Sequence, residues 1–127
     1  MGSPLGDVSV RVFVSSLEEA QRFYEQQLEL KPKFKQPGTS VTTYDAGNAI
    51  VVVEQVDGDD EEGLEYVGRF TGITFKTASC RTAYNELASR GVEFVEEPEE
   101  QFWGGIMAHF RDPSGNVFTI LEDPNEV

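Results

Sequence analysis

Few side chains in this sequence combine a reactive group with the spacing of a catalytic or metal site. The chain has one histidine, His109, and one cysteine, Cys80. It contains no cluster of histidines and cysteines, no Ser-His-Asp set and no glycine-rich phosphate loop. A lone histidine on a strand is more often a surface or packing residue than a metal ligand. We therefore assign no catalytic residue from these groups.

Two glutamates, Glu54 and Glu122, are the remaining candidates for metal or acid-base chemistry. Each ends one of two similar apolar runs, GNAIVVVE (47–54) and GNVFTILE (115–122). Gly-Asn, an apolar run and a final glutamate recur in the same order, which indicates an internal repeat. We interpret both glutamates as strand-end carboxylates in solvent.

The elements that position these residues also occur twice. Alternation of apolar and polar residues predicts strands, and a capping box at Ser16 and Glu19 begins the first helix. Asp112-Pro113-Ser114-Gly115 has the chemistry of a type I turn. We expect helices within 15–30 and over about 79–90, and strands over 8–14, 39–44, 49–56, 73–76, 92–95, 105–111 and 116–122.

The repeat predicts a single domain over residues 1–127, built from two βαβββ modules. Module one spans 7–56, an acidic linker spans 57–70, and module two spans 71–123. Each module is too small to bury its sheet alone, so the two are expected to pair. The predicted fold class is α+β, with a curved mixed sheet forming a cup and the helices outside it.

Composition excludes several classes of partner. The net charge is −13 and the isoelectric point is about 4.3, which argues against nucleic acid and against an anionic membrane surface. No apolar run approaches the roughly 20 residues of a membrane span. The single cysteine and the absence of signal-peptide features in residues 1–6 favour the cytoplasm.

Two stretches carry a resemblance to a known family. VFVSSLEEAQRFYEQQLEL (12–30) and FWGGIMAHFRDPSGNVFTILE (102–122) resemble the first helix and the closing hairpin of the vicinal oxygen chelate superfamily. This family includes glyoxalase I, extradiol dioxygenases, fosfomycin-resistance enzymes and bleomycin-resistance proteins. The resemblance covers about residues 7 to 122. One departure is Leu28-Glu29, where the family typically has Leu-Gly.

The resemblance implies four positions for metal ligands, on the first and last strands of each module. In this sequence the positions map to Ser9, Val51, Gly72 and Thr119. A divalent cation prefers imidazole or carboxylate, so none of the four is a good ligand. We expect no metal and no other cofactor.

The same alternation predicts which side chains line the cup. Arg11 would bind an anionic or carbonyl group or pair with a local carboxylate, and Phe13 and Trp103 could stack on a planar ligand. His109 is expected to pair with Phe118 on the outer face if the closing loop is 112–115. The predicted inner face is Ser9, Arg11, Phe13, Val51, Val53, Thr74, Lys76, Thr119 and Leu121. The predicted outer face is Val10, Val12, Val14, Ile50, Val52, Ile73, Phe75, Phe118 and Ile120, with Glu54 and Glu122 also directed away from the cup.

The leading functional hypothesis is metal-free binding of a small molecule, as in the bleomycin-resistance branch. The resemblance implies a homodimer whose cleft sequesters an antibiotic or other metabolite, and thus a role in antibiotic resistance. The linker allows pairing of modules within a chain or swapped between chains. The predicted ligand-binding residues are Ser9, Arg11, Phe13, Val51, Thr74, Trp103 and Thr119.

Three other functions stay open from the sequence. The first is a glyoxalase-like lyase or dioxygenase-type enzyme with a divalent metal. The second is a metal-free enzyme that uses Arg11 or His109. The third is an interaction module whose cup is occupied.

Overall fold

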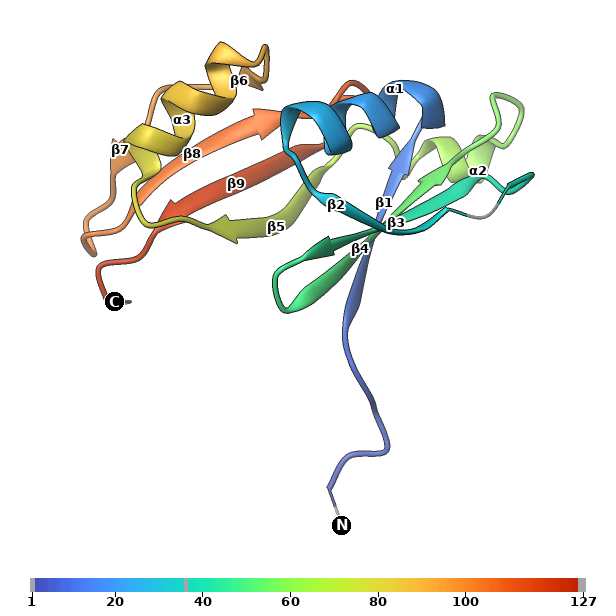
Figure 1. Ribbon diagram of the computed structural model, residues 1–127, viewed down its shortest axis with the longest axis horizontal. Coiled ribbons are helices and arrows are strands. Elements are labelled where there is room, and N and C mark those ends of the chain that lie inside the picture. The colour runs from blue at the N-terminus through green and yellow to red at the C-terminus, as the bar shows by residue number, and fades with distance from the viewer. Residues whose placement is uncertain (1, 36, 126–127) are drawn as a thin grey trace.

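The computed structural model of the protein describes residues 2–35 and 37–125. These residues form a four-stranded sheet, a five-stranded sheet and the helices that accompany them (Figure 1). The first sheet has the strand order β1-β4-β3-β2. In the second the order is β5-β9-β8-β6, and β7 also pairs with β8. The strands are β1 (Ser9–Val14), β2 (Lys31–Lys35), β3 (Val41–Ala46), β4 (Ala49–Gln55), β5 (Phe70–Lys76), β6 (Glu93–Phe94), β7 (Glu99–Glu100), β8 (Ile106–Arg111) and β9 (Val117–Glu122). The helices are α1 (Leu17–Arg22), its π-helical continuation η1 (Phe23–Gln27), α2 (Glu61–Leu64) and α3 (Cys80–Ser89).

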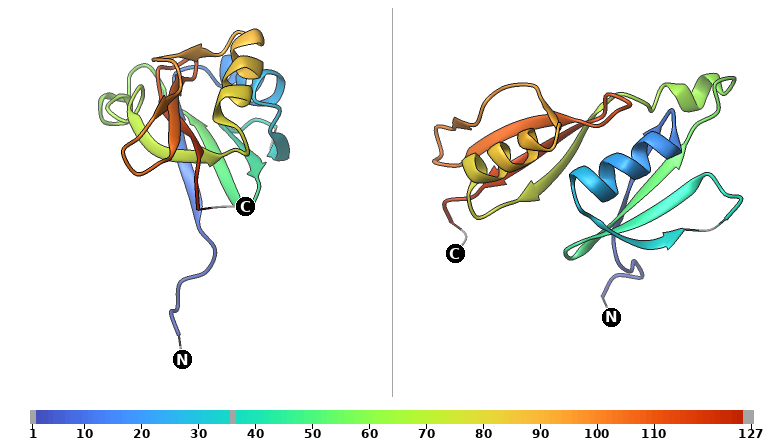
Figure 2. Two further views of the ribbon diagram at one scale, coloured as in Figure 1. Left: turned by 90° about the vertical axis from the view of Figure 1, so that its left-hand side faces the viewer. Right: turned by 45° about the horizontal axis from the view of Figure 1, so that its top comes forward.

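The two sheets are inclined to each other and carry α1 and α3 on the same side (Figure 2). The opposite faces of the two sheets, which α1 and α3 do not cover, are called the cup faces below. The edge strands β1 and β5 come together at one end only, where Phe13 bridges to Val67 and the Asn116 side chain donates to the Phe13 carbonyl at 2.8 Å. From this junction the sheets diverge, so the curved sheet is not closed within one chain. The predicted α+β fold is confirmed.

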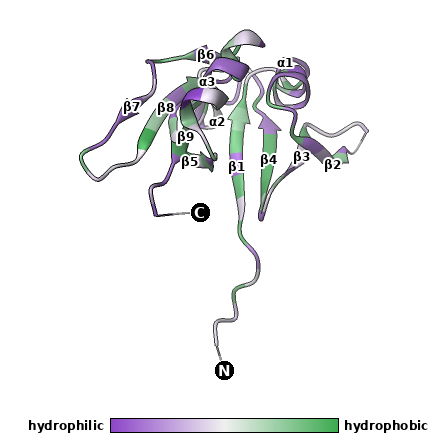
Figure 3. Cartoon of the chain, turned by 60° about the vertical axis from the view of Figure 1, so that its left-hand side comes forward, coloured by the Kyte–Doolittle hydropathy of each residue, from purple (hydrophilic) through white to green (hydrophobic). Residues whose placement is uncertain are grey.

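A single hydrophobic core joins the two modules on the helix side of the sheets. Tyr24, at the start of η1, is fully buried and contacts both sheets through rings 5.7 Å from Tyr44 and 6.1 Å from Phe118. Hydrophobic residues dominate the central strands, whereas hydrophilic residues are frequent on the helices (Figure 3). None of the described helices is long and apolar enough to cross a membrane.

The register of module one corrects the predicted facing of β4. Val12 on β1 lies opposite Val53 on β4, and both are buried beneath α1. Val51 and Val53 therefore face the helix, and Ile50, Val52 and Glu54 face the cup, the reverse of the prediction.

The cause of this error is a difference between the two hairpin loops. Ala46 pairs with Ala49, which leaves a two-residue turn, but Arg111 pairs with Val117, which leaves a five-residue loop. The prediction counted β4 from Gly47 and β9 from Gly115 as if the two loops were equal. This places the residues of β4 one position out of register. The shift inverts every side chain, because successive residues of a strand point to opposite faces. On β5 and β9 of module two the predicted facing is confirmed, since Thr74 pairs with Thr119 and Phe75 with Ile120.

The main helices of the two modules, α1 with its continuation η1 and α3, begin alike but end differently. The Ser16 and Ser79 side chains each accept a hydrogen bond from the backbone three residues later. The second helix is followed by Gly91 with φ +89°, the left-handed conformation that glycine adopts easily. The first is followed by Glu29 with φ 57°, at the position where the resembling family has glycine. The departure from the family pattern thus places a side chain where backbone geometry favours none.

The acidic linker is more ordered than its composition suggested. Asp60 caps the short helix α2, and its side chain accepts from the Gly63 amide at 3.0 Å. After this helix Tyr66 returns to the first sheet, where its ring lies 5.3 Å from that of Phe13. The interpretation of residues 57–63 as a solvated loop was therefore incomplete.

Candidate functional site

The cup face of module one combines two arginines, two aromatic rings and one carboxylate. Arg11 donates to Glu54 at 2.9 Å, and its guanidinium lies 5.0 Å from the centre of the Phe13 ring. Of the two roles predicted for Arg11, the structure has the pairing with a local carboxylate. The pair is exposed, with 60% and 32% of the two side chains accessible. Exposed pairs contribute little to stability, so a ligand can displace either partner at low cost.

A cavity of about 370 Å³ separates β1 from β5 beside this cluster. Arg69 stacks over Tyr66 at 5.8 Å and lines the cavity together with Arg11, Phe13 and Phe70. Aromatic faces with guanidinium groups above them suit planar or anionic groups. Ser9 lies two residues before Arg11 on the same face and is exposed.

The cup face of module two has a row of three side chains across neighbouring strands. Thr119 on β9 pairs with Thr74 on β5 and with His109 on β8. Thr119 is 2% exposed, and Thr74 is exposed. His109 therefore lies on the cup face, and the predicted pairing with Phe118 on the outer face is wrong. The closing loop spans 112–116, one residue longer than assumed.

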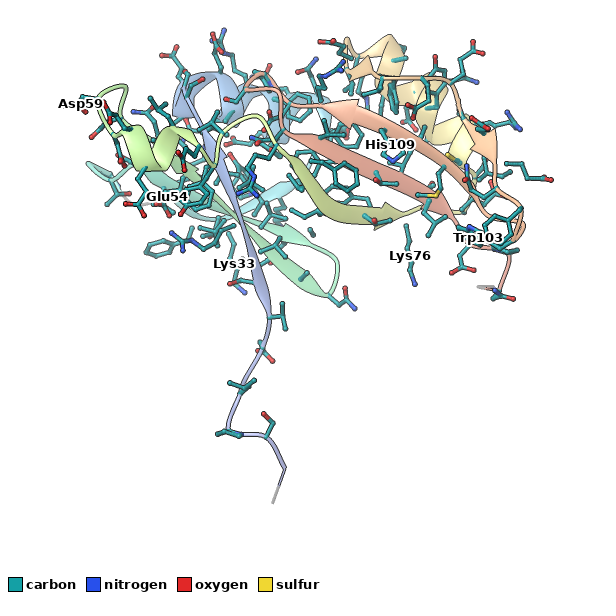
Figure 4. All side chains as sticks on the ribbon, turned by 180° about the vertical axis from the view of Figure 1, so that it is seen from behind. Lys33, Glu54, Asp59, Lys76, Trp103 and His109 are labelled. Carbon is teal, nitrogen blue, oxygen red and sulfur yellow. The ribbon has the colours of Figure 1, made fainter. Side chains whose placement is uncertain are left out.

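Trp103 lies at the far end of this face. A side chain at Gly105 would overlap the Trp103 ring, and Gly105 continues the alternation of Met107 and His109. The indole therefore covers the cup face of β8, where it is 43% exposed. Figure 4 places Trp103 and Glu54 at opposite ends of the molecule. Because Arg11 is bonded to Glu54, one chain cannot bring Trp103 and Arg11 to the same ligand.

The DPSGN turn is part of the framework. Tyr24 donates to Asp112 at 2.7 Å, and Asn116 accepts from the Gly68 and Arg69 amides. Asp112 and Asn116 are buried and bonded to each other. Burial, and then the neighbouring Asp112 carboxylate, raise the pKa of Tyr24 well above its ordinary value.

Gln55 and Glu122 have equivalent structural roles at the ends of β4 and β9. Gln55 accepts from the Leu17 amide at 2.8 Å, and Glu122 accepts from the Cys80 amide at 2.9 Å. Both bonds satisfy the first turn of a helix. Glu122 is thus a helix cap, and the prediction of a carboxylate in open solvent is wrong. Burial and the Glu122 carboxylate raise the pKa of the Cys80 thiol.

The four metal-ligand positions of the resembling family can now be assigned from the structure. Ser9 and Gly72 each precede a helix N-cap by seven residues, and Thr119 and Val52 are equivalent on β9 and β4. Val52 thus replaces Val51 in the predicted set. Two hydroxyls, an alkyl group and a glycine do not fit a divalent cation. Within residues 2–35 and 37–125, no three histidine, cysteine or acidic side chains form a group able to hold one.

Two βαβββ modules, with helices on one side and open cup faces on the other, define a class of small proteins built around a concave ligand site. The chain belongs to the Glyoxalase/Bleomycin resistance protein/Dioxygenase superfamily, whose profile matches residues 8–120.

Three relatives illustrate the range of similarity. A superfamily member from Sphaerobacter thermophilus DSM 20745 is 30% identical, with a TM-score of 0.79, covering 94% of this chain and 98% of that one. TnmS3, an antibiotic binding protein from Streptomyces sp. CB03234, is 25% identical, with a TM-score of 0.76 and coverage of 95% and 98%. The Bacillus subtilis (strain 168) protein YraH is 22% identical over 123 residues, which are 91% of this chain and 96% of YraH.

Sequence reasoning missed several residues of the cup faces. The facing of Glu54 and His109 follows once the two hairpin loops are counted separately. Tyr66 and Arg69 had no local signal, because their contacts depend on how the linker returns to β1.

Proposed function

We propose that the protein is a metal-free small-molecule binding protein of the cytoplasm, which sequesters an antibiotic or other metabolite. The observation that carries this proposal is the content of the four metal positions. They hold Ser9, Val52, Gly72 and Thr119, and the surrounding cup faces keep aromatic and hydrogen-bonding side chains. The similarity to TnmS3, an antibiotic binding protein, supports the same class of function.

The proposed binding unit is a homodimer. Within one chain the cup faces diverge from the Phe13–Val67 junction, and Trp103 lies at the opposite end from the Arg11–Glu54 pair. A second copy placed so that its module two faces module one of the first would bring Trp103 to the Arg11 and Phe13 cluster. The proposed ligand-binding residues are Ser9, Arg11, Phe13, Thr74, Trp103 and Thr119. Val51 gives way to Val52, since Val51 faces the helix.

Isothermal titration with a panel of planar aromatic antibiotics, in buffer with a chelator, tests the binding function. A compound that binds in the presence of chelator supports the proposal. Trp103→Ala should weaken its binding at least about tenfold, since a buried aromatic anchor dominates the affinity of such sites. Phe102→Ala is the matched control, because Phe102 is adjacent and fully exposed, and it should change affinity less than about twofold. Binding that requires added metal would contradict the proposal and favour the lyase or dioxygenase alternative.

A mixed dimer tests whether the cleft is shared between chains. One chain carries Phe13→Ala and the other Trp103→Ala, with different tags for purification. If module one of one chain meets module two of its partner, one cleft of the mixed dimer holds both defects and the other holds none. Half of the sites should then bind with wild-type affinity. Uniformly weak binding at every site would indicate that both modules of a cleft come from the same chain.

A further inference from the structure

The only histidine of the chain is oriented by two hydrogen bonds to a single carboxylate oxygen. Nδ1 of His109 lies 2.7 Å from Oε1 of Glu96, and the His109 backbone amide donates to the same oxygen at 3.0 Å. Glu96 belongs to the loop between β6 and β7, and His109 to β8. The backbone bond fixes the oxygen, and the oxygen then fixes the ring. A group that accepts a hydrogen bond from one ring nitrogen of a histidine determines which of the two nitrogens carries the proton.

The carboxylate accepts, so Nδ1 carries the proton when the ring is neutral. Nε2 is then left with a free lone pair. No described residue makes a hydrogen bond to Nε2, and 29% of the side chain is accessible. The ring lies on the cup face, because His109 pairs with Thr119 and not with the buried Phe118 (Figure 4). The cup face of module two therefore presents one oriented hydrogen-bond acceptor.

The surroundings of His109 suit a flat, mostly apolar molecule. The Phe70 ring lies 6.0 Å from the imidazole. Toward the start of β8, Met107 and Leu121 pair on the same face. They lie between His109 and the Trp103 ring, which covers Gly105. His109 lies four steps along the strand from Gly105, which corresponds to about 13 Å. A molecule of two or three fused or linked rings would cover Met107 and Leu121 with its ends near Trp103 and His109.

We propose that His109 is the specificity-determining residue of the cleft, and that its Nε2 accepts a hydrogen bond from an O–H or N–H group of a planar aromatic ligand. This inference rests on the proposed function, because it names the ligand chemistry of the same site. Glu96 is a positioning residue that acts through the imidazole.

The tautomer of His109 tests the positioning step without any ligand. A single histidine gives one set of imidazole signals in ¹⁵N-edited NMR spectra, recorded at about pH 8.5, above the ordinary titration range of an imidazole. The wild-type protein should show the proton on Nδ1. Glu96→Ala should move it to Nε2, and Glu97→Ala, at the exposed neighbour, should leave it on Nδ1. A wild-type ring protonated on Nε2 would overturn the inference.

Two flavones test the recognition step. 6-Hydroxyflavone and 6-methoxyflavone share their rings and differ in one donor, and their affinities are measured by isothermal titration. The wild-type protein should bind the hydroxyl compound about tenfold more tightly, close to the upper end of what one neutral hydrogen bond contributes. His109→Phe should remove this preference, so that the two compounds bind this variant within about twofold of each other.

The outcomes separate the inference from the function on which it rests. Equal binding of both flavones by the wild-type protein, with both weakened by Trp103→Ala, would overturn the role of His109 and leave the binding function in place. Absence of binding by either flavone would overturn the assigned ligand class. A preference that persists in His109→Phe would place the acceptor on another residue.

Discussion

The two modules are most alike where they fold and most different where they face the cup. Each begins its helix at a serine cap and ends its last strand with a side chain, Gln55 or Glu122, bonded to the first turn of that helix. Their cup faces, however, carry unlike groups. Module one presents the Arg11–Glu54 pair beside Phe13, and module two presents Met107, Leu121, Trp103 and the oriented His109. The repeat thus preserves the framework and leaves the ligand face of each module to differ.

A second contrast separates the two Gly-Asn motifs of the repeat. Asn48 belongs to an exposed two-residue turn, whereas Asn116 is buried and joins β1, the linker and Asp112. The motif that is most specific to the family is therefore a structural junction between modules. Recognition of the family consequently says little about the chemistry of the cup.

The largest expected effect tests the contrast between Asn116 and Asn48. Asn116→Ala removes a buried side chain that bonds the Gly68 and Arg69 amides and the Phe13 carbonyl, and should lower the free energy of unfolding by about 2–3 kcal/mol. Asn48→Ala, at the corresponding asparagine, should change it by less than about 0.5 kcal/mol. Urea unfolding of both variants measures the difference. Equal effects would mean that the junction does not hold the modules together.

Tyr24→Phe tests the bond from η1 to the same junction. Loss of the hydrogen bond to Asp112 should cost about 1–2 kcal/mol near neutral pH. Because burial raises the pKa of Tyr24 in the folded state, its contribution is complete below the unfolded value near 10 and declines as the pH rises above it. The wild-type protein should thus lose stability above about pH 10 more steeply than Tyr24→Phe. Parallel pH profiles of the two proteins would argue against this role.

The paired caps at the strand ends allow a direct comparison of the modules. Gln55→Ala and Glu122→Ala should each lower stability by about 1 kcal/mol, as loss of a helix cap does. Glu122→Ala should have the larger effect, since a charged acceptor interacts more strongly with a helix N-terminus. Thermal unfolding of both variants, with Gln26→Ala as an exposed control, tests this order. A larger loss for Gln55→Ala would reverse the comparison.

The smallest effect concerns the two helix ends. Glu29→Gly should stabilise the protein by up to about 1 kcal/mol, because it relieves a left-handed residue at a position that Gly91 fills in module two. Loss of the exposed Arg90–Glu29 ion pair subtracts little from this gain. Gly91→Ala is the reciprocal change and should destabilise. A destabilised Glu29→Gly protein would show that the ion pair outweighs the backbone strain.

The framework followed from local sequence signals, and the facing of the cup followed only in part. The Ser16 cap and the Asp112–Gly115 turn act through neighbours within a few residues. Hydrogen bonds of 3.0 Å and 3.3 Å confirm the turn and the half of the predicted capping box in which Ser16 accepts from the Glu19 amide. No strand was predicted over Lys31–Lys35, which forms β2. Every residue of this stretch is exposed, and it has no apolar alternation.

The cup required two kinds of information that a single strand does not carry. The facing of Val51, Glu54 and His109 depends on the length of a hairpin loop, where one residue inverts the strand. The contact of Tyr66 with Phe13 depends on how the linker returns to β1, which lies far away in the sequence. The first is set by strand pairing across a hairpin, and the second is a long-range consequence of packing.

The most direct test of metal-free binding is the metal affinity of the purified protein. Elemental analysis of protein prepared without chelator is combined with thermal unfolding in the presence of nickel, zinc, manganese or iron(II). With Ser9, Val52, Gly72 and Thr119 at the four positions, we predict no stoichiometric metal and no rise in Tm. One bound metal per chain, or a Tm raised by several degrees, would contradict the account and bring the lyase or dioxygenase alternative to the front.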